Sequence, residues 1–184
     1  MRKILLTSSG FETARITEAF LSLLPKAAED TKALFITAAA NTPDAIEVLP
    51  KCLGDLLNAG IRRENITVFD LHRNMSDDEL QQFDAIYFTG GSTKYLLQRI
   101  NDTGFRKTLG RFIEVGGVYV GVSAGSVVAA NNLPDNLGYL GCELHVHAQS
   151  GTKAGVINFT ENLQIHLTGE CAVLIMDAGA AVFE

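Results

Sequence analysis

The residues best suited to chemistry lie in a glycine-flanked run in the second half of the chain, Gly121-Val122-Ser123-Ala124-Gly125. An apolar, strand-like stretch over 118–120 leads into this run, and small, helix-compatible residues over 124–130 lead out of it. A serine on a sharp turn between a strand and a helix presents its hydroxyl to solvent, and glycines beside it leave room for the turn. Ser123 is therefore a candidate nucleophile; the alternative is a helix N-cap in a structural turn.

A second glycine turn, Gly90-Gly91-Ser92-Thr93, follows the apolar run Ala85–Thr89 and precedes a helical pattern. The carboxyl ends of parallel strands meet at one edge of a sheet, where ligand sites collect, so this turn and Ser123 are expected at the same edge. An N–H group of the turn could pair with that of Ala124 to hold an oxyanion. One alternative is that the glycines serve only to form the loop. A phosphate-binding loop is a less favoured alternative, because no Gly-Lys-Ser/Thr sequence follows.

A serine nucleophile needs a base, and the four histidines are His72, His145, His147 and His166. His145 and His147 share the strand-like run Cys142–Ala148, where alternation places them on the same side. Such a pair could ligate a metal, but no third ligand follows at suitable spacing, so no metal site is expected. A group that orients the base could be Glu170 in the turn after Thr168; its competitors are Asp135, Glu143, Glu161 and Asp177.

Composition excludes several classes of function. The chain has 184 residues, a net charge of −6 and 47% hydrophobic residues, which is typical of a globular protein. No run of like charges reaches five, so neither nucleic acid nor an anionic membrane is an expected partner. The sequence has no stretch of about 18 apolar residues, so no helix that spans a bilayer is expected. Three scattered cysteines and a short apolar stretch at the N-terminus favour a cytoplasmic protein without a signal peptide, and no cofactor is expected.

Short apolar runs alternate with amphipathic stretches along the first two thirds of the chain. The expected strands are Lys3–Leu6, Ala33–Thr37, Thr67–Leu71, Ala85–Thr89 and Val118–Val122. The expected helices are Thr13–Leu24, Asp44–Ala59, Asp77–Gln82, Tyr95–Ile100, Phe105–Val115 and Ser126–Ala130. This alternation predicts an α/β fold with a doubly wound, mostly parallel sheet flanked by helices. Later β-like runs are expected to add hairpins or edge strands to the same sheet, giving one domain over 1–184.

The two glycine turns and their spacing of 32 positions, from Gly91 to Ser123, resemble the dipeptidase E and cyanophycinase-like serine peptidases of peptidase family S51. The likeness covers roughly the first 130 residues. It implies a fold akin to class I glutamine amidotransferases and a peptidase that cleaves dipeptides or short peptides. It further implies that the nucleophile, base, orienting acid and oxyanion donors are, in that order, Ser123, His147, Glu170 and the N–H groups of Gly91 and Ala124. Supporting positions are then His145, Gly90 and Ser92.

The sequence departs from this family in its second half. The segments from serine to histidine and from histidine to glutamate are shorter than in full-length dipeptidases. Dipeptidases that prefer an amino-terminal aspartate need a cation for its side chain, yet no arginine follows Arg111, and Lys153 is the only positive residue there. One alternative is therefore an inactive relative that binds a peptide or small molecule. Another is a cysteine nucleophile, as in glutamine amidotransferases, although no cysteine lies in such a turn. Either a monomer or a homodimer fits.

Overall fold

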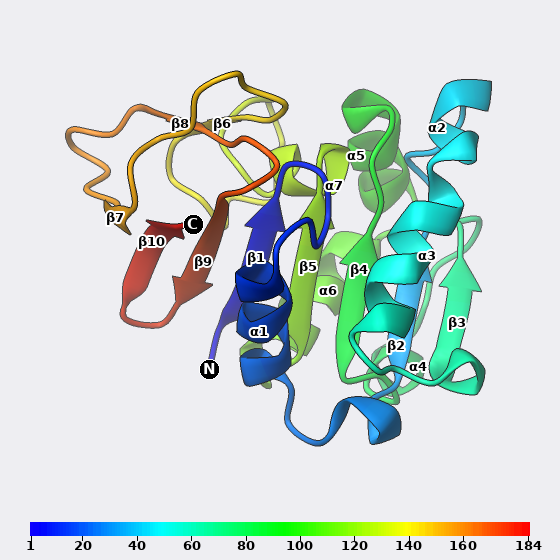
Figure 1. Cartoon of the computed structure of the whole chain (residues 1–184). Helices are drawn as coiled ribbons and strands as arrows, with labels where there is room; N and C mark the ends of the chain where they lie inside the picture. Colours follow the sequence, from blue (N-terminus) through cyan, green and yellow to red (C-terminus); the bar gives the residue numbers. More distant parts are fainter.

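Eight strands form the central sheet of the computed structural model, which describes residues 1–184 (Figure 1). Their order across the sheet is β3-β2-β4-β5-β1-β9-β10-β7. The strands are β1 (Lys3–Thr7), β2 (Ala33–Ile36), β3 (Ile66–Phe69), β4 (Ala85–Phe88), β5 (Val118–Val122), β7 (Gly155–Val156), β9 (Ala172–Met176) and β10 (Gly179–Phe183).

The first five strands are parallel, and all residues of β2, β4 and β5 are buried. Continuous apolar runs are typical of strands that are covered on both faces. The prediction of five parallel strands, and of a mostly parallel sheet flanked by helices, is confirmed. β5 has the predicted bounds, and the ends of the other four strands differ from the predicted ones by at most two residues.

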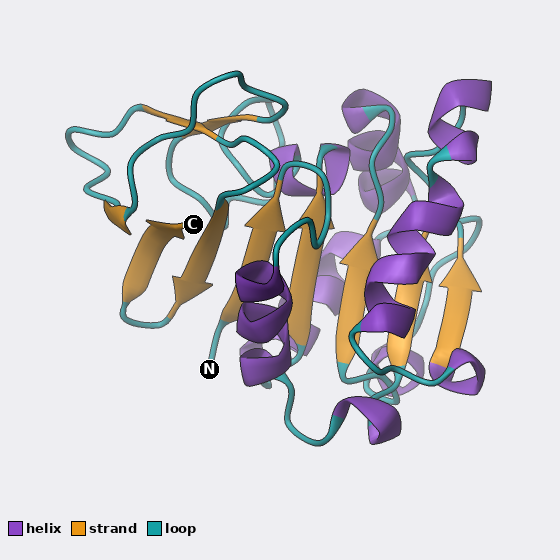
Figure 2. Ribbon diagram, in the orientation of Figure 1, coloured by secondary structure: helices purple, strands orange, loops and turns teal.

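Helices cover both faces of this sheet (Figure 2). They are α1 (Ala14–Leu23), α2 (Pro43–Glu47), α3 (Leu49–Asn58), α4 (Asp77–Leu80), α5 (Thr93–Asp102), α6 (Phe105–Glu114) and α7 (Ala124–Val127). Apolar residues of α1 and α3 form the core on one face, and those of α4, α5 and α6 form the larger core on the other. None of these helices has the length and apolar character needed to cross a membrane. The assignment of 1–184 to one domain stays a prediction.

The predicted helix Asp44–Ala59 is wrong in one respect, because it is two helices that meet at Val48. Pro50 lies in the first turn of α3. Proline has no N–H group, and its ring clashes with the carbonyl four residues earlier, so a helix is kinked or broken at this position. The break turns α2 away from the sheet, with no buried residue of its own.

The C-terminal third only partly follows the prediction. β9, β10 and β7 extend the sheet with antiparallel pairs, as expected. However, β6 (Glu143–His145) and β8 (Gln164–His166) form a separate parallel pair, so the expectation that they join the same sheet is wrong. The edge of β1 is already occupied by β9, and the amide groups of β6 find partners in neighbouring loops, for example Leu144 N–H on Asn132 Oδ1 at 2.9 Å. The β6–β8 pair lies above the carboxyl end of β1 and the start of β9 (Figure 1).

Candidate active site

Ser123 lies on the sharp turn between β5 and α7. Its φ is 49° and its ψ is −108°, a conformation that costs a non-glycine residue about 1–3 kcal/mol and persists only when the surroundings impose it. Its N–H donates to the carbonyl of Thr7 at 3.1 Å. The end of β1 therefore holds the backbone of the candidate nucleophile.

The glycines beside the serine allow the turn to close. A Cβ on Gly121 would lie 2.6 Å from the carbonyl carbon of Gly125, and one on Gly125 would lie 2.6 Å from Phe88 Cβ. The buried hydroxyl of Ser126 then ties the turn together, because its single O–H lies 2.7 Å from both the carbonyl of Thr7 and that of Gly121. Both glycines are thus required by close approach of the backbone.

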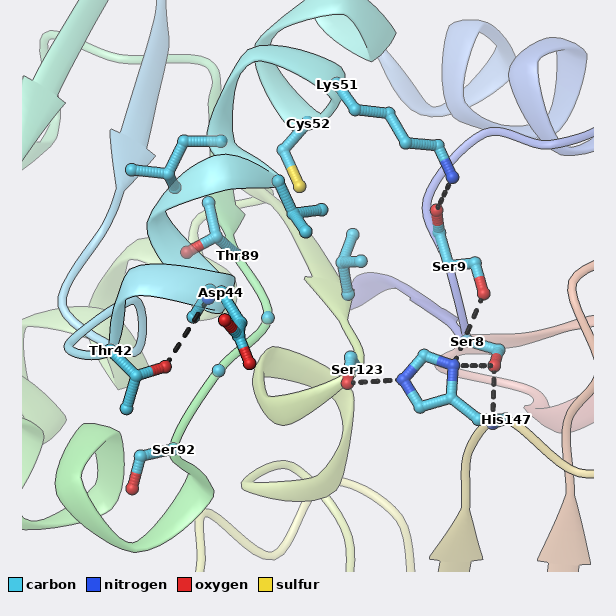
Figure 3. Close-up of a pocket in the computed structure, with 16 residues that line it drawn as sticks. Ser8, Ser9, Thr42, Asp44, Lys51, Cys52, Thr89, Ser92, Ser123 and His147 are labelled. Atoms are coloured by element: carbon cyan, nitrogen blue, oxygen red, sulfur yellow. Dashed lines mark hydrogen bonds between the residues drawn. The ribbon is translucent and has the colours of Figure 1, made fainter.

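His147 faces the serine across the candidate site. Its Nε2 lies 2.9 Å from Ser123 Oγ, and the two side chains point toward one another (Figure 3). The predicted strand through His145 and His147 is wrong, because β6 ends at His145 and His147 has φ of 57°. A left-handed residue breaks the alternation of a strand, so the two histidines do not belong to one face.

Two hydroxyls lie on the other side of the imidazole (Figure 3). Ser8 Oγ accepts the backbone N–H of His147 at 2.7 Å and lies 3.4 Å from its Nδ1. Ser9 Oγ lies 3.5 Å from the same Nδ1. Both serines follow the carboxyl end of β1, so the loop after this strand contacts the candidate base.

The other histidines lie elsewhere. His145 pairs with Glu143 at 3.4 Å and stacks on His166 with ring centroids 4.9 Å apart. His72 pairs with Asp70 after β3. No three or more His, Cys, Asp or Glu side chains are arranged to hold a metal ion. Of the two histidines that the sequence left open, the structure brings His147 to Ser123.

Glu170 forms no polar contact with His147. No hydrogen bond or ion pair joins its carboxylate to the imidazole, and its N–H donates to Thr168 Oγ1 at 3.1 Å in an exposed turn. This turn does lie beside the loop after β1, since a Cβ on the neighbouring Gly169 would be 4.0 Å from Ser9 Oγ. The role of Glu170 in orienting the base therefore stays a prediction.

The second glycine turn lies against the nucleophile. A Cβ on Gly90 would be 3.2 Å from Ser123 Cβ. The N–H groups of Gly91 and Ala124 donate to no group of the chain, whereas Ser92 donates to the carbonyl of Ala39 at 2.8 Å and its hydroxyl caps α5. An oxyanion site requires unpaired N–H groups of this kind, and both turns lie at the sheet edge that carries Ser123.

Gly91 allows a test of this turn. Its φ is +133°, and a Cβ there would lie 2.5 Å from the carbonyl carbon of Ala39. We expect Gly91→Ala to destabilise the protein by about 3 kcal/mol or more, and any folded fraction to lose on the order of 100-fold in turnover. Gly104→Ala is the matched control, since Gly104 has φ of +72° but nothing within 4 Å, and about 1 kcal/mol is expected. Urea unfolding compares the two variants, and equal losses would contradict this account.

Ser123 and His147 open into a cavity of about 570 Å³. Its wall is formed by the ends of β1, β4 and β5, by the glycine turn, and by α2 and α3. Lys51 and Asp44 are the charged residues that line it. Lys51 pairs with Glu12 and donates to the Ser9 carbonyl at 3.4 Å, and the Glu12 carboxylate raises the pKa of the amine.

Cys52 also lines the cavity, from α3. Burial raises the pKa of its thiol. The nucleophilic form of cysteine is the thiolate, which a raised pKa disfavours. The only cysteine at the cavity thus lies within a helix rather than on a turn, and its thiol form is favoured over the nucleophilic thiolate.

A half-buried carboxylate, that of Asp55, holds the loop after β1 against α3. Asp55 Oδ2 accepts the Phe11 N–H at 3.1 Å and the Tyr87 hydroxyl at 2.5 Å. Lys51, one turn earlier on the same helix, holds the carbonyl of Ser9. The position of the hydroxyls behind His147 is thus determined from two sides, by β1 and by α3.

Asp55 predicts a pH dependence of stability. Burial is the largest of the causes that act on it and raises its pKa above the ordinary 3.8, despite the hydrogen bonds from Tyr87 and Phe11. A carboxyl with a raised pKa stabilises the fold fully only below the unfolded value, and this contribution is lost as pH rises through the folded value. Asp55→Asn removes the titration. We expect the unfolding free energy of this variant relative to wild type to increase between about pH 4 and pH 7, measured with urea at each pH; a decrease would contradict the sign.

Sequence reasoning missed four residues of the site, namely Ser8, Ser9, Asp44 and Lys51. A partial signal existed for the serines, since they follow the first predicted strand and so belong to the sheet edge that carries Ser123. No comparable signal exists for Asp44, which is at the cavity because α2 and α3 break apart at Val48. Lys153, the cation noted in the sequence, does not line the cavity, whereas Lys51 does.

Comparison with known proteins agrees with this fold. The model of peptidase family S51 matches residues 4–137. The uncharacterized peptidase Lmo0363 of Listeria monocytogenes is 29% identical over 136 residues, which are 72% of this chain and 63% of that protein. The uncharacterized peptidase PM1590 of Pasteurella multocida is 38% identical over 56 residues, which are 30% of this chain and 27% of that protein. The chain thus matches less than two thirds of these relatives' length.

Two solved structures share the fold. One is a protein of Listeria monocytogenes EGD-e described as a peptidase E, with a TM-score of 0.77 and 21% identity over 100% of this chain and 98% of that one. The other is a peptidase from an acI-B1 Actinobacterium, with a TM-score of 0.69 and 16% identity over 100% of this chain and 87% of that one.

Proposed function

Because this chain belongs to peptidase family S51, we propose that it is a serine-type peptidase that hydrolyses dipeptides or short peptides. The observation that carries the proposal is the 2.9 Å contact between Ser123 Oγ and His147 Nε2 at the mouth of a cavity. A hydroxyl within hydrogen-bond reach of an imidazole is the arrangement that activates a serine nucleophile.

The reaction would proceed in two stages. His147 Nε2 takes the hydroxyl proton as Ser123 Oγ attacks the scissile carbonyl, and the N–H groups of Gly91 and Ala124 hold the oxyanion. The imidazolium then gives its proton to the leaving amine as the scissile C–N bond breaks, and the acyl group remains on Ser123 as an ester. Water, deprotonated by the same histidine, releases the acyl group. Glu170 is the carboxylate that the family resemblance predicts behind the base, and its part in this scheme stays a prediction.

The cavity supports a small substrate. A volume of about 570 Å³ is in the range of pockets that enclose a ligand of a few hundred daltons. Its two charged residues differ in their surroundings, because Lys51 is paired with Glu12 whereas Asp44 forms no ion pair. The Asp44 carboxylate is therefore available to an amino group of a short peptide, whereas a carboxylate of the peptide would compete with Glu12 for Lys51.

A peptide panel tests the proposal. The native protein is incubated with dipeptides and longer peptides, including ones that begin with aspartate, and the release of free amine is followed over time. A fluorophosphonate, which phosphonylates activated serines, is added to a second sample, and the labelled peptide is identified by mass spectrometry. Hydrolysis together with labelling of Ser123 supports a serine peptidase. If the protein shows no hydrolysis and Ser123 is not labelled, the result favours the alternative of a binding module.

A further inference from the structure

The end of β1 contacts both members of the candidate catalytic pair. The carbonyl of Thr7 accepts the N–H of Ser123 at 3.1 Å, and the hydroxyl of the next residue, Ser8, accepts the N–H of His147 at 2.7 Å. His147 is 139 positions from Ser8 in the sequence and lies in a loop outside the main sheet. Two adjacent residues of one strand end thus place the nucleophile and the base relative to each other.

The left-handed backbone of His147 makes the contact with Ser8 important. A non-glycine residue with φ of 57° persists only when its surroundings impose it. The N–H of His147 is turned out of the β6 ladder, and the Ser8 hydroxyl is its acceptor. Ser8 itself is fixed, with 1% of its surface exposed. Loss of this hydroxyl removes the acceptor that holds the residue in its strained conformation.

We propose that Ser8 is a positioning residue for the base, fixing both the backbone of His147 and the tautomer of its imidazole; this inference rests on the proposed function. For Nε2 to take the proton of Ser123, Nδ1 must carry the ring hydrogen. Ser8 Oγ lies 3.4 Å from Nδ1 and keeps a lone pair after accepting the backbone N–H, so it is placed to accept Nδ1–H in this tautomer. A hydroxyl thereby occupies the position that the sequence assigned to the carboxylate of Glu170.

Three variants test this role, namely Ser8→Ala, Ser8→Thr and Glu170→Gln, with Ser22→Ala on the exposed face of α1 as the matched control. Because the position is buried, thermal unfolding first shows which variants are folded. We expect Ser8→Ala to lower kcat by about 100-fold while KM changes by less than about threefold, since a misplaced base affects the chemical step rather than binding. Ser8→Thr keeps the hydroxyl and is expected to recover at least about tenfold of this loss.

The tautomer supplies a readout that does not depend on activity. Magnetic resonance of isotope-labelled imidazole nitrogens, assigned with a His147→Asn variant, is expected to show the hydrogen on Nδ1 in the native protein and a mixture in Ser8→Ala. A hydrogen on Nε2 in the native protein would overturn the inference. So would a folded Ser8→Ala with native kcat, or a larger loss of kcat in Glu170→Gln than in Ser8→Ala. If no peptide is cleaved, the proposed function fails, and the tautomer still decides the role of Ser8.

Discussion

Replacing Ser123 by alanine is expected to lower kcat for peptide hydrolysis by at least about 10⁴-fold, because the residue that forms the acyl bond is lost. The substitution leaves the fold intact, since the only partner of Ser123 Oγ is His147 Nε2. Alanine also has the same backbone strain at φ of 49°. Amine release from the best substrate of the peptide panel, measured beside thermal unfolding of both proteins, checks the two halves of this prediction.

Ser126→Ala provides the opposite pattern. The Ser126 hydroxyl shares its single hydrogen between two carbonyls and accepts the N–H of Thr7 at 3.0 Å, all within the buried base of the turn. Loss of this hydroxyl leaves the buried N–H of Thr7 without its acceptor. We expect a cost of about 2–3 kcal/mol in the free energy of unfolding, while the nucleophile remains. An active Ser123→Ala variant, or one that loses stability as Ser126→Ala does, would contradict the assignment of Ser123.

The elements that depend on continuous apolar runs could be predicted from the sequence. β5 has the predicted bounds because each of its residues is buried and only a strand between two helical layers accommodates such a run. The turn that carries Ser123 was also predicted from local sequence. Two glycines lie on either side of the serine, an apolar strand precedes them and a run of small residues follows them. These features are local, so a short window of sequence contains them.

The features that depend on distant contacts could not be predicted in this way. Alternation along Cys142–Ala148 indicated one strand, but the contact of the His147 N–H with Ser8, 139 positions away, accompanies a left-handed turn there. No local pattern reports such a pair. The break between α2 and α3 had a local signal in Pro50, whereas the placement of Asp44 at the cavity that follows from it did not. The contact between Lys51 and the loop after β1 likewise depends on how α3 packs.

The second large effect is expected at His147. Asparagine tolerates a left-handed backbone better than most residues, so His147→Asn keeps the conformation at φ of 57° while removing the group that takes the proton. We expect kcat to fall by at least about 10⁴-fold, to nearly the level of Ser123→Ala, because serine and histidine act as a unit. The double variant should then lose little more than either single variant.

His145→Asn is the matched control for this substitution. His145 lies two positions away, pairs with Glu143 and stacks on His166, and has no contact with Ser123. Its loss is expected to reduce kcat by less than about tenfold through small shifts of the β6–β8 pair that supports the loop of His147. If His145→Asn is instead the inactive variant and His147→Asn the active one, the base is His145. In that case the 2.9 Å contact between His147 and Ser123 is not the one that carries the reaction.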